Sequence, residues 1–404
     1  MIRPVTQICL LGSTGSIGTS TLDVVRRRAG EFRVFALVAG RNAESLAAQI
    51  LEFRPRVAVV ASDEVLKELT VILSGSSLPR AGWPELAAGP EARVAAAVAP
   101  EVDFVMSAIV GVSGLEATYE AVCRHKRIGL ANKEVLVASG GLVIDAARRN
   151  STELIPVDSE HNGAHQCFRA GQRSEVKRLI LTASGGPFRN TPIEELQSVT
   201  PAQALKHPTW KMGQRITIDS ATMMNKGFEV IEACWLFGLV PDEVDVVIHP
   251  QSTVHAMVEY NDGSVMAQVS AADMRMPIQY ALTYPARASA PVPRLDWSEA
   301  RYWEFYPPDL QRFPLLRHAY EAQRTGGSAT CTLNAADEIA VEAFLREEIS
   351  FQGIEEVVSE TLERVDSRTA GSVKEVLEID AESRRVAREQ VRKRIGRTEL
   401  SVKA

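Results

Sequence analysis

Two carboxylates stand two positions apart in the stretch PVDSEHN, residues 156–162, with a serine between them. On an extended segment the side chains at i and i+2 point to the same side, so we expect Asp158 and Glu160 to converge while Ser159 faces away. Two carboxylates so close repel each other unless a cation or a shared proton stabilises them. An oxygen-liking divalent cation such as Mg²⁺ or Mn²⁺ is the simplest explanation, and a solvated strand end is the alternative.

A third carboxylate lies in the segment 219–238, which has a helical pattern. The cap-type residues Asp219 and Ser220 stand at its start, and we expect the helix to begin there. The apolar residues recur with helical spacing, which predicts one apolar face formed by Met224, Phe228, Ile231 and Trp235. The polar residues of the segment are then expected on a different face.

That polar face gathers Thr222, Asn225, Lys226 and Glu229. Glu229 is a candidate for the third metal ligand. Ser220, Asn225 and Lys226 offer a hydroxyl, an amide and an ammonium, which suit an anion such as phosphate. The alternative is a surface ion pair between Lys226 and Glu229.

The segment 184–215 has the features of a lid over a substrate. It begins with a Ser-Gly-Gly-Pro turn after a predicted strand, and this turn could offer backbone N–H groups and the Ser184 hydroxyl to a phosphate. It ends with the stretch KHPTWKMGQR, which carries His207, Trp210 and Met212. A long segment with little core pattern is typical of a lid. Taken singly, His207 could instead be a surface histidine and Trp210 a packed aromatic residue.

These groups need elements that position them, and the first 150 residues alternate short β-branched runs with helical patterns. The runs predict buried strands over 7–12, 33–40, 57–61, 103–111 and 127–132. Strands that alternate with helices predict a parallel, doubly wound sheet with right-handed crossovers.

The turn after the first predicted strand reads Gly12-Ser-Thr-Gly15-Ser-Ile-Gly18 and opens a helix, which is the context of a dinucleotide-binding loop. Glycines allow a tight turn, and the helix N-terminus supplies N–H groups for a pyrophosphate. The spacing GxxGxxG differs from the usual GxGxxG, and a glycine-rich turn that binds nothing is the alternative. Arg41 stands after the second strand, where an NAD-binding fold usually has an acidic residue, so NADPH is favoured; a solvated arginine at a helix start is the alternative.

The rest of the chain is expected to form a second α/β region, a linker and a helical end. Residues 151–284 contain further strand patterns around an Asn-Asp-Gly turn, and residues 285–313 are rich in proline and aromatic residues and read as an ordered linker. Residues 314–404 have helical patterns, one of them with Asn334 as its expected N-cap, and predict a small bundle. Two histidines on the predicted strands lack acidic neighbours in sequence and are read as structural: His249 and His255.

Composition excludes several classes of protein. Among 404 residues, 45% are hydrophobic and 24% charged, which is ordinary for a globular protein. The net charge of −6 and the absence of a long basic block argue against a nucleic-acid partner. The five cysteines are odd in number and widely spaced, which argues against a disulfide framework and fits a reducing compartment. Neither a signal peptide nor a membrane-spanning run is apparent, so we expect a cytoplasmic protein without a membrane partner.

Six motifs occur in one order along the chain: LGSTGSIG, ANKE, PVDSEHN, LTASGGPF, KHPTWKMG and DSATMMNKGFE. Together they closely resemble the 1-deoxy-D-xylulose 5-phosphate reductoisomerase family, from residue 7 into the C-terminal helices, although no motif after about residue 370 can be matched. The resemblance implies an α/β fold with an N-terminal Rossmann-like parallel sheet, a central α/β catalytic domain and a C-terminal helical bundle. It implies an NADPH-binding domain at 1–150, a catalytic domain at 151–284 with the lid at 184–215, a linker at 285–313 and a helical domain at 314–404.

The resemblance also implies roles for individual residues. The metal ligands would be Asp158, Glu160 and Glu229. The residues that bind substrate would be Lys133, Ser159, Glu160, Ser184, His207, Trp210, Met212, Ser220, Asn225, Lys226 and Glu229. Those that act in catalysis would be Lys133, Asp158, Glu160, His207 and Glu229. The cofactor would contact Thr14, Gly15, Ser16, Ile17, Gly40, Arg41, Asn42, Asn132, Glu134 and Gly213. Two departures stand out, Arg41 where many relatives carry lysine and Ala183 where glycine is usual.

The implied reaction is rearrangement of a phosphorylated 2-keto sugar, by retroaldol/aldol cleavage or an α-ketol shift, followed by hydride transfer from NADPH. The implied metal is Mg²⁺ or Mn²⁺, with Co²⁺ as a further option, and the implied assembly is a homodimer. Two rival hypotheses stay open at this point. A plain NADPH-linked reductase would leave the three carboxylates without a task, and an NADPH-binding module would show no turnover.

Overall fold

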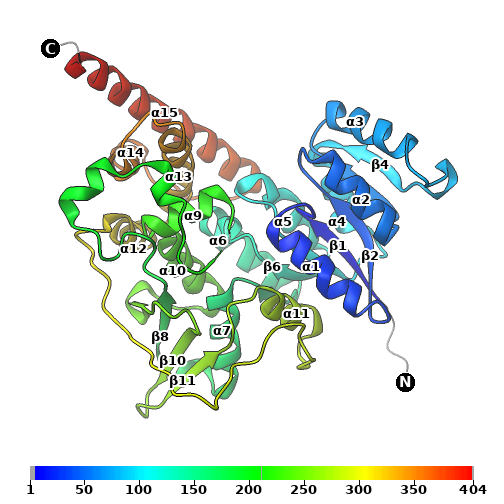
Figure 1. Cartoon of the computed structure of the whole chain (residues 1–404), viewed down its shortest axis with the longest axis horizontal. Helices are drawn as coiled ribbons and strands as arrows, with labels where there is room; N and C mark the ends of the chain where they lie inside the picture. The colour runs from blue at the N-terminus through cyan, green and yellow to red at the C-terminus, as the bar shows by residue number, and fades with distance from the viewer. Residues whose placement is uncertain (1–4, 211, 403–404) are drawn as a thin grey trace. The chain divides into compact units, whose positions relative to one another are not determined.

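The computed structural model describes residues 5–210 and 212–402, with side chains as far as residue 395 (Figure 1). The chain divides into two compact units, which are described here one at a time. The first unit comprises Met1–Val135, Val143–Asn162 and Asp273–Pro293. The second unit comprises Leu136–Leu142, Gly163–Ala272 and Arg294–Ala404. The helices α6 (Glu134–Arg149) and α7 (Ser159–Cys167) contribute residues to both units.

The first unit is built on a seven-stranded sheet in the order β4-β3-β2-β1-β5-β6-β7, and every pair is parallel. Its strands are β1 (Thr6–Leu11), β2 (Phe32–Val38), β3 (Val57–Val60), β4 (Glu85–Ala88), β5 (Phe104–Ser107), β6 (Arg127–Leu130) and β7 (Leu154–Pro156). The predicted doubly wound sheet is confirmed, although β4 was not predicted. The strand order reverses between β1 and β5, and open α/β sheets bind ligands outside the carboxyl ends of the strands at such a point.

Helices cover this sheet, which explains why its strands are continuous apolar runs. They are α1 (Ser16–Arg27), α2 (Ala43–Phe53), α3 (Asp63–Ser74), α4 (Gly89–Val98) and α5 (Leu115–Cys123), and Figure 1 shows several of them beside β1 and β2. The core includes Ile8, Leu10, Phe104 and Met106, all at most 1% exposed. The helix α11 (Arg275–Thr283) comes from far along the chain, yet it adds its buried Ile278 to the same core.

The second unit contains a four-stranded sheet in the order β11-β10-β8-β9. The strands are β8 (Val176–Ala183), β9 (Val244–Ile248), β10 (Val254–Tyr260) and β11 (Val265–Val269). The β8–β9 pair is parallel and the others are antiparallel, which confirms the hairpin predicted around the Asn-Asp-Gly turn. One face of the sheet packs on the helix α10 (Met224–Phe237), whose Val230 and Ala233 join the buried core.

The segment 219–238 forms parts of two helices, so the prediction of a single helix that begins at Asp219 was wrong. The helix α9 (Gln214–Ala221) ends before Thr222, and α10 begins at Met224. The break is at Met223, whose backbone is left-handed with φ of 65°, while the Thr222 hydroxyl accepts the Met224 N–H at 3.3 Å. Asp219 and Ser220 therefore lie in the last turn of α9. The predicted apolar face of α10 is confirmed, since Met224, Phe228 and Ile231 lie in one buried cluster and Trp235 is partly buried against it.

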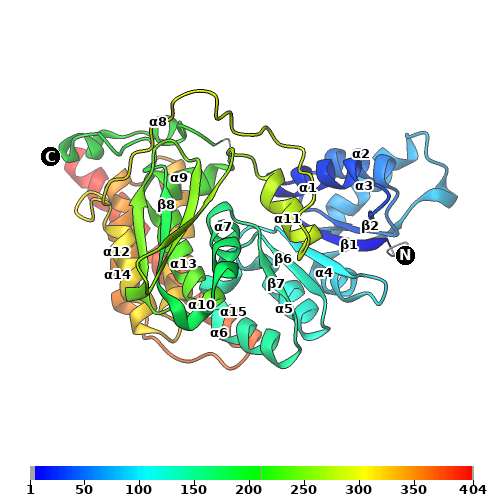
Figure 2. The ribbon, with the colours of Figure 1, turned by 90° about the horizontal axis from the view of Figure 1, so that it is seen from below.

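The C-terminal residues form the predicted helical bundle, seen on the left of Figure 2. Its helices are α12 (Pro314–Thr325), α13 (Ala329–Leu345), α14 (Phe351–Arg364) and α15 (Val373–Val402). The prediction that Asn334 caps a helix was wrong, because α13 begins after Ser328 and Asn334 is fully buried in its interior. The residues before Asn334, Ala-Thr-Cys-Thr-Leu, are all buried, and they can be helical because α12, α14 and α15 pack around α13. In the part of the chain that is described, we find no helix with the length and apolar character that crossing a bilayer requires.

Candidate active site

The glycine-rich turn of the first unit connects β1 to α1 at the carboxyl edge of the parallel sheet. Gly12 has φ of +87°, and a Cβ there would lie 2.4 Å from the Ala108 carbonyl oxygen. A Cβ on Gly18 would lie 2.3 Å from the Gly12 carbonyl oxygen, so both positions require glycine. Gly15 is the N-cap of α1 and has no side chain to occupy the first-turn N–H groups. The turn is thus a backbone cradle at a helix N-terminus, which suits a pyrophosphate.

The predicted cofactor residues of this unit lie at the ends of its strands. Gly40 and Arg41 are exposed after β2, and the Asn42 side chain accepts the Ser45 N–H at 2.9 Å as the N-cap of α2. An exposed guanidinium at this place suits a 2′-phosphate. Asn132 follows β6, is 2% exposed, and donates through Nδ2 to the carbonyls of Ile109 and Gly111. Its amide therefore fixes the turn after β5, a role that the sequence did not indicate.

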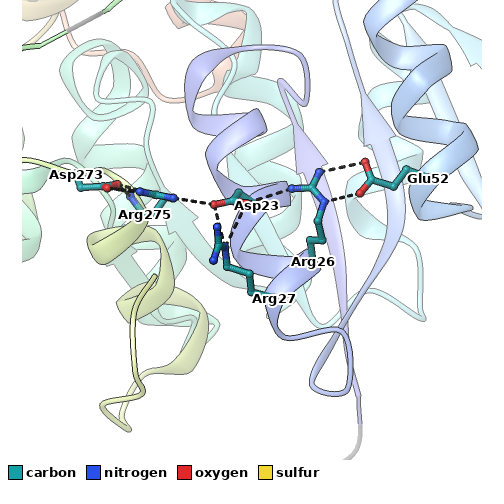
Figure 3. Close-up of polar contacts among 6 residues, drawn as sticks. All are labelled: Asp23, Arg26, Arg27, Glu52, Asp273 and Arg275. Atoms are coloured by element: carbon teal, nitrogen blue, oxygen red, sulfur yellow. Dashed lines mark hydrogen bonds and ion pairs between the residues drawn. The ribbon is translucent and has the colours of Figure 1, made fainter. Parts of the chain in front are cut away.

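A charged network joins the helix after the glycine-rich turn to α11 (Figure 3). Arg275 donates to Asp23 of α1 at 3.0 Å and to Asp273 at 2.6 Å. Partial burial raises the pKa of Asp23, but the hydrogen bond from Arg275 and the charge of Arg27 bring this pKa below its ordinary value. The chain of contacts continues through Arg26, which donates to Glu52 of α2 at 2.5 Å. The sequence carries no signal of this network, since Asp23 and Arg275 are 252 positions apart.

Asp158 and Glu160 do not lie on an extended segment, so that prediction was wrong. β7 ends at Pro156 and α7 begins at Ser159, which places Glu160 in the first helical turn. The chain changes from strand to helix at Asp158. Its carbonyl accepts the Asn162 N–H at 2.8 Å, as in a helix, and its carboxylate accepts the Ser159 N–H at 3.0 Å. Acidic side chains are favoured at a helix N-terminus by the helix dipole.

The two carboxylates nevertheless converge, as expected. A carboxylate oxygen of Asp158 lies within 4.8 Å of one of Glu160. Ser159 does not face away, because its hydroxyl donates to Glu160 Oε2 at 2.5 Å. Lys133 Nζ lies 2.5 Å from Asp158 Oδ2, and its side chain is only 8% exposed. The first unit thus presents two acidic groups, a hydroxyl and a buried ammonium at the end of the sheet.

Glu229 and Lys226 are buried on α10 in the second unit, so they are not a solvated surface pair. Glu229 is fully buried and Lys226 is 3% exposed, and the two side chains form an ion pair. Asn225 Nδ2 donates to the other carboxylate oxygen of Glu229 at 2.7 Å. Placing an ion pair in the interior is costly, which makes this group a candidate for function rather than for stability.

His207 connects three segments of the second unit. Its Nε2 atom lies 3.1 Å from the Ser184 hydroxyl after β8 and 3.1 Å from the Ser220 hydroxyl of α9. Its Nδ1 atom accepts the backbone N–H groups of Thr209 at 3.1 Å and Trp210 at 2.9 Å. Because Nδ1 is an acceptor, the neutral ring carries its proton on Nε2 and donates it toward the hydroxyls. Burial lowers the pKa of His207 below its ordinary value, which favours this neutral form.

The turn at the start of the predicted lid packs closely on α9. Gly186 has φ of +66°, and a Cβ there would lie 2.7 Å from the Ser220 carbonyl oxygen. Parts of the lid segment are more firmly anchored than its sequence suggested, because Phe188, Leu196 and Ala204 are buried in the core with α10 and α13. Trp210 and Met212 are half-buried, and Gly213 is exposed. Lys211, between them, lies outside the described residues.

The structure therefore places the predicted residues in two groups, one in each unit. The first unit carries Thr14, Gly15, Ser16, Ile17, Gly40, Arg41, Asn42, Asn132, Lys133, Glu134, Asp158, Ser159 and Glu160. The second unit carries Ser184, His207, Trp210, Met212, Gly213, Ser220, Asn225, Lys226 and Glu229. One group combines a dinucleotide-type loop with acidic residues, and the other combines hydroxyls, an amide, an ammonium and a buried carboxylate.

Comparison with known families gives matches along most of the chain. The 1-deoxy-D-xylulose 5-phosphate reductoisomerase profile matches residues 8–140, and the profile of that enzyme's C-terminal domain matches residues 154–237. A second profile, DXP reductoisomerase C-terminal domain, matches residues 269–386. A relative from Solibacter usitatus, named 1-deoxy-D-xylulose 5-phosphate reductoisomerase, is 70% identical over 95% of this chain and 96% of its own. A relative of the same name from Moorella thermoacetica is 50% identical over 94% and 97% of the two chains.

Solved structures agree with these matches. The enzyme from Zymomonas mobilis in complex with NADPH is 44% identical, with a TM-score of 0.88 over 96% of this chain and 99% of that one. A DOX-P reductoisomerase in complex with NADPH, fosmidomycin and magnesium is 39% identical, with a TM-score of 0.90 over 96% and 98% of the two chains.

Proposed function

The chain belongs to the 1-deoxy-D-xylulose 5-phosphate reductoisomerase family, and we propose which of its residues carry the family's reaction. That reaction is the metal-dependent and NADPH-dependent conversion of 1-deoxy-D-xylulose 5-phosphate to 2-C-methyl-D-erythritol 4-phosphate. The residue assignment depends above all on one observation, the burial of Glu229 in an ion pair with Lys226. Burying two charges has a large desolvation cost, so such a pair is expected where an anionic substrate and a cation are bound.

NADPH is assigned to the first unit. The turn from Gly12 to Gly18, with Thr14, Gly15, Ser16 and Ile17, would bind the pyrophosphate through the N-terminus of α1. Arg41 would pair with the 2′-phosphate, beside Gly40 and Asn42. Asn132 and Glu134 follow β6 at the same edge of the sheet and would meet the nicotinamide half, and Gly213 would contact the cofactor from the lid.

The divalent metal is assigned to Asp158, Glu160 and Glu229. These donors are all carboxylate oxygens, which are the ligands that Mg²⁺ and Mn²⁺ prefer, and Co²⁺ accepts them as well. The convergence of Asp158 and Glu160 at the start of α7 supports the assignment, because two carboxylates so close repel each other and a bound cation removes that repulsion. When bound, the metal would act as a Lewis acid on the oxygens of the substrate. Lys133 Nζ, buried beside Asp158, is the group that can hold a proton at a substrate oxygen.

The substrate phosphate is assigned to the second unit. Ser184 and Ser220 would donate their hydroxyls, and Asn225 and Lys226 would add an amide and an ammonium. His207 would orient both hydroxyls through its Nε2 proton. Ser159, beside the carboxylates, would contact the sugar. Trp210 and Met212 would cover the substrate and exclude water, and binding of the remote phosphate would supply energy for that closure.

Three further assignments concern the setting of the enzyme. We propose a homodimer, which is supported by the exposed side chains of Val265 and Met266 on the edge strand β11 and of Trp297 and Tyr302 in the linker. We propose a cytoplasmic location, which is supported by five free cysteines. The product would enter the non-mevalonate route to isoprenoids.

The test is turnover of the purified protein with 1-deoxy-D-xylulose 5-phosphate, followed by NADPH oxidation and by identification of the product. We expect oxidation with Mg²⁺ or Mn²⁺, no oxidation in EDTA, and a branched four-carbon-chain polyol phosphate as the product. A plain reductase would remain active in EDTA and would give an unbranched polyol, and either result would contradict the metal assignment. An NADPH-binding module would bind the cofactor without any turnover.

A further inference from the structure

A charged cluster of the second unit lies outside the residues assigned above. We call it the Arg215 cluster, and its members come from α9, α13 and α15: Arg215, Asp219, Asn334, Asp337, Glu338, Asp380 and Arg384. The cluster contains four carboxyl groups and two guanidinium groups. The sequence suggested only that Asp219 and Asn334 begin helices, and it gave no sign that these residues lie together.

Arg215 is the centre of the cluster. Its Nη1 atom donates to Glu338 Oε1 at 2.8 Å, and its Nη2 atom donates to Asn334 Oδ1 at 3.0 Å. Its guanidinium also lies 6.0 Å from the centre of the Phe228 ring of α10. One side chain in the first turn of α9 is thus held by α13 and lies against an aromatic ring of α10. A planar guanidinium that makes several fixed hydrogen bonds defines both position and orientation.

Glu338 also contacts α15. Its second carboxylate oxygen accepts Arg384 Nη2 at 2.6 Å, and Arg384 Nε donates to Asp380 at 2.6 Å. Glu338 is 17% exposed and Arg384 is 19% exposed, so water weakens these contacts little. Glu338 therefore bridges the arginine of α9 and the arginine of α15.

Asp337 lies fully buried next to this bridge, with Arg215 Nη2 3.6 Å from its Oδ2 atom. Burial first, and the negative charge of Asp219 second, raise the pKa of Asp337 well above its ordinary value, while Arg215 lowers it. A protonated Asp337 leaves three carboxylates to balance two guanidinium groups.

The helix that the cluster anchors is short and weakly capped. α9 has eight residues, and its N-cap, Gly213, makes no side-chain hydrogen bond. A helix of this length is unstable without tertiary contacts. Yet α9 begins within the last two residues of the lid and carries Ser220, whose hydroxyl lies 3.1 Å from His207 Nε2. Its orientation therefore determines where Ser220 and His207 stand.

We propose that Glu338 and Asp337 are positioning residues for the phosphate end of the active site, acting through Arg215 and Asp219 on helix α9. The proposal rests on the assignment of Ser220 and His207 to the substrate phosphate. Removal of the Glu338 carboxylate would release Arg215, and the last turn of α9 would lose its fixed distance from His207. Binding of the phosphosugar would weaken, whereas binding of NADPH to the first unit would not.

The test compares Glu338→Gln with Glu342→Gln, a matched control on the same helix whose side chain is 53% exposed and pairs with Arg346 on the surface. For Glu338→Gln we expect KM for 1-deoxy-D-xylulose 5-phosphate to rise by about tenfold, as for the loss of a charge-assisted hydrogen bond, with KM for NADPH unchanged. Hydrogen exchange of the amides at 214–221 should become faster. Arg215→Lys keeps the charge but loses the fork of hydrogen bonds, and it should reproduce both effects. An unchanged KM for the phosphosugar in both variants, or an equal rise in both KM values, would overturn the proposal.

A second pair of variants examines the neutral carboxyl group. Asp337→Asn should leave KM for the phosphosugar within about twofold of the wild type, because an amide replaces a protonated carboxyl group, while Asp337→Ala should raise it. Equal damage by both would contradict a neutral Asp337. Wild-type protein without turnover would refute the assigned function. Normal turnover, with normal kinetics of Glu338→Gln and Arg215→Lys, would refute the positioning role alone.

Discussion

His207 Nδ1 accepts the backbone N–H of Trp210 at 2.9 Å, and this contact determines the tautomer of the ring. Protonation of Nδ1 would set an N–H group against two others, those of Thr209 and Trp210. The contact therefore acts in the same direction as burial, which lowers the pKa of His207. A neutral His207 can accept the N–H groups of Thr209 and Trp210 at Nδ1 while its Nε2 proton is directed at the hydroxyls of Ser184 and Ser220.

The first prediction concerns pH. Because the pKa of His207 is lowered in the folded state, its neutral form contributes full stability above the ordinary value of 6.5, and this contribution is lost as pH falls from there through the folded pKa. The free energy of unfolding of the wild type should therefore fall more between about pH 7.5 and about pH 5.5 than that of His207→Gln, which has no titrating group there. Denaturant unfolding at both pH values measures the difference, and parallel pH dependence in the two proteins would contradict the neutral assignment.

The second prediction concerns the buried pair on α10. Lys226→Met leaves the Glu229 carboxylate buried without its cation, so without metal the free energy of unfolding should fall by about 3 kcal/mol. The control is Lys374→Met on α15, where the Lys374–Glu378 pair is 86% and 61% exposed and its removal should cost less than about 0.5 kcal/mol. Chemical denaturation of both variants in EDTA gives the comparison. Similar losses would mean that the α10 pair is solvated in solution.

The third prediction concerns the glycine-rich turn. Gly18→Ala would place a Cβ 2.3 Å from the Gly12 carbonyl oxygen, which has little freedom to move. We therefore expect the variant to lose NADPH binding and its free energy of unfolding to fall by about 2 kcal/mol. Gly30→Ala is the control, because a Cβ there meets nothing within 4 Å. Fluorescence titration with NADPH measures the binding. Normal affinity in Gly18→Ala would show that the turn is not the cradle of the cofactor.

The fourth prediction concerns the network of Figure 3. Arg275→Met removes the ion pairs to Asp23 and Asp273, which fix α11 against the helix that follows the cofactor turn. We expect KM for NADPH to rise about threefold, as for a loss of somewhat under 1 kcal/mol, while KM for the phosphosugar stays unchanged. Arg148→Met, whose side chain is 73% exposed, should change neither constant. A rise in KM for the phosphosugar alone would contradict a role of this network in NADPH binding.

The sequence predicted the elements whose signals are local. The strands of the parallel sheet are uninterrupted apolar runs, and the glycine-rich turn follows the first of them, so both were found within a residue or two at most ends. The errors arose where two local rules competed. At Asp158 the spacing of the carboxylates suggested a strand, but the Asp158 carbonyl accepts the Asn162 N–H and so begins a helix, while its carboxylate accepts the Ser159 N–H. At Asn334 a cap-type residue suggested a helix start, but burial by neighbouring helices extends α13 upstream.

Contacts between residues far apart in the chain had no signal in a single sequence. Arg215 and Glu338 are 123 positions apart, and Arg178 pairs with Glu259 across 81 positions. Each is an ordinary charged residue in its own segment. Only the fold shows that the Arg215 side chain is 18% exposed and lies at the centre of a cluster, whereas the Arg178 side chain is 42% exposed.

The most direct test of the central claim is turnover of Glu229→Gln. The substitution removes one negative charge and keeps the size of a fully buried side chain, and the glutamine oxygen can still accept a hydrogen bond from the buried Lys226 ammonium. Retained NADPH binding serves as the check that the variant is folded. With 1-deoxy-D-xylulose 5-phosphate and saturating Mg²⁺, we predict that NADPH oxidation falls at least a hundredfold, and that NADPH affinity stays at the wild-type value. Oxidation at the wild-type rate, with the same requirement for metal, would show that Glu229 does not bind the metal and would contradict the assignment of the site.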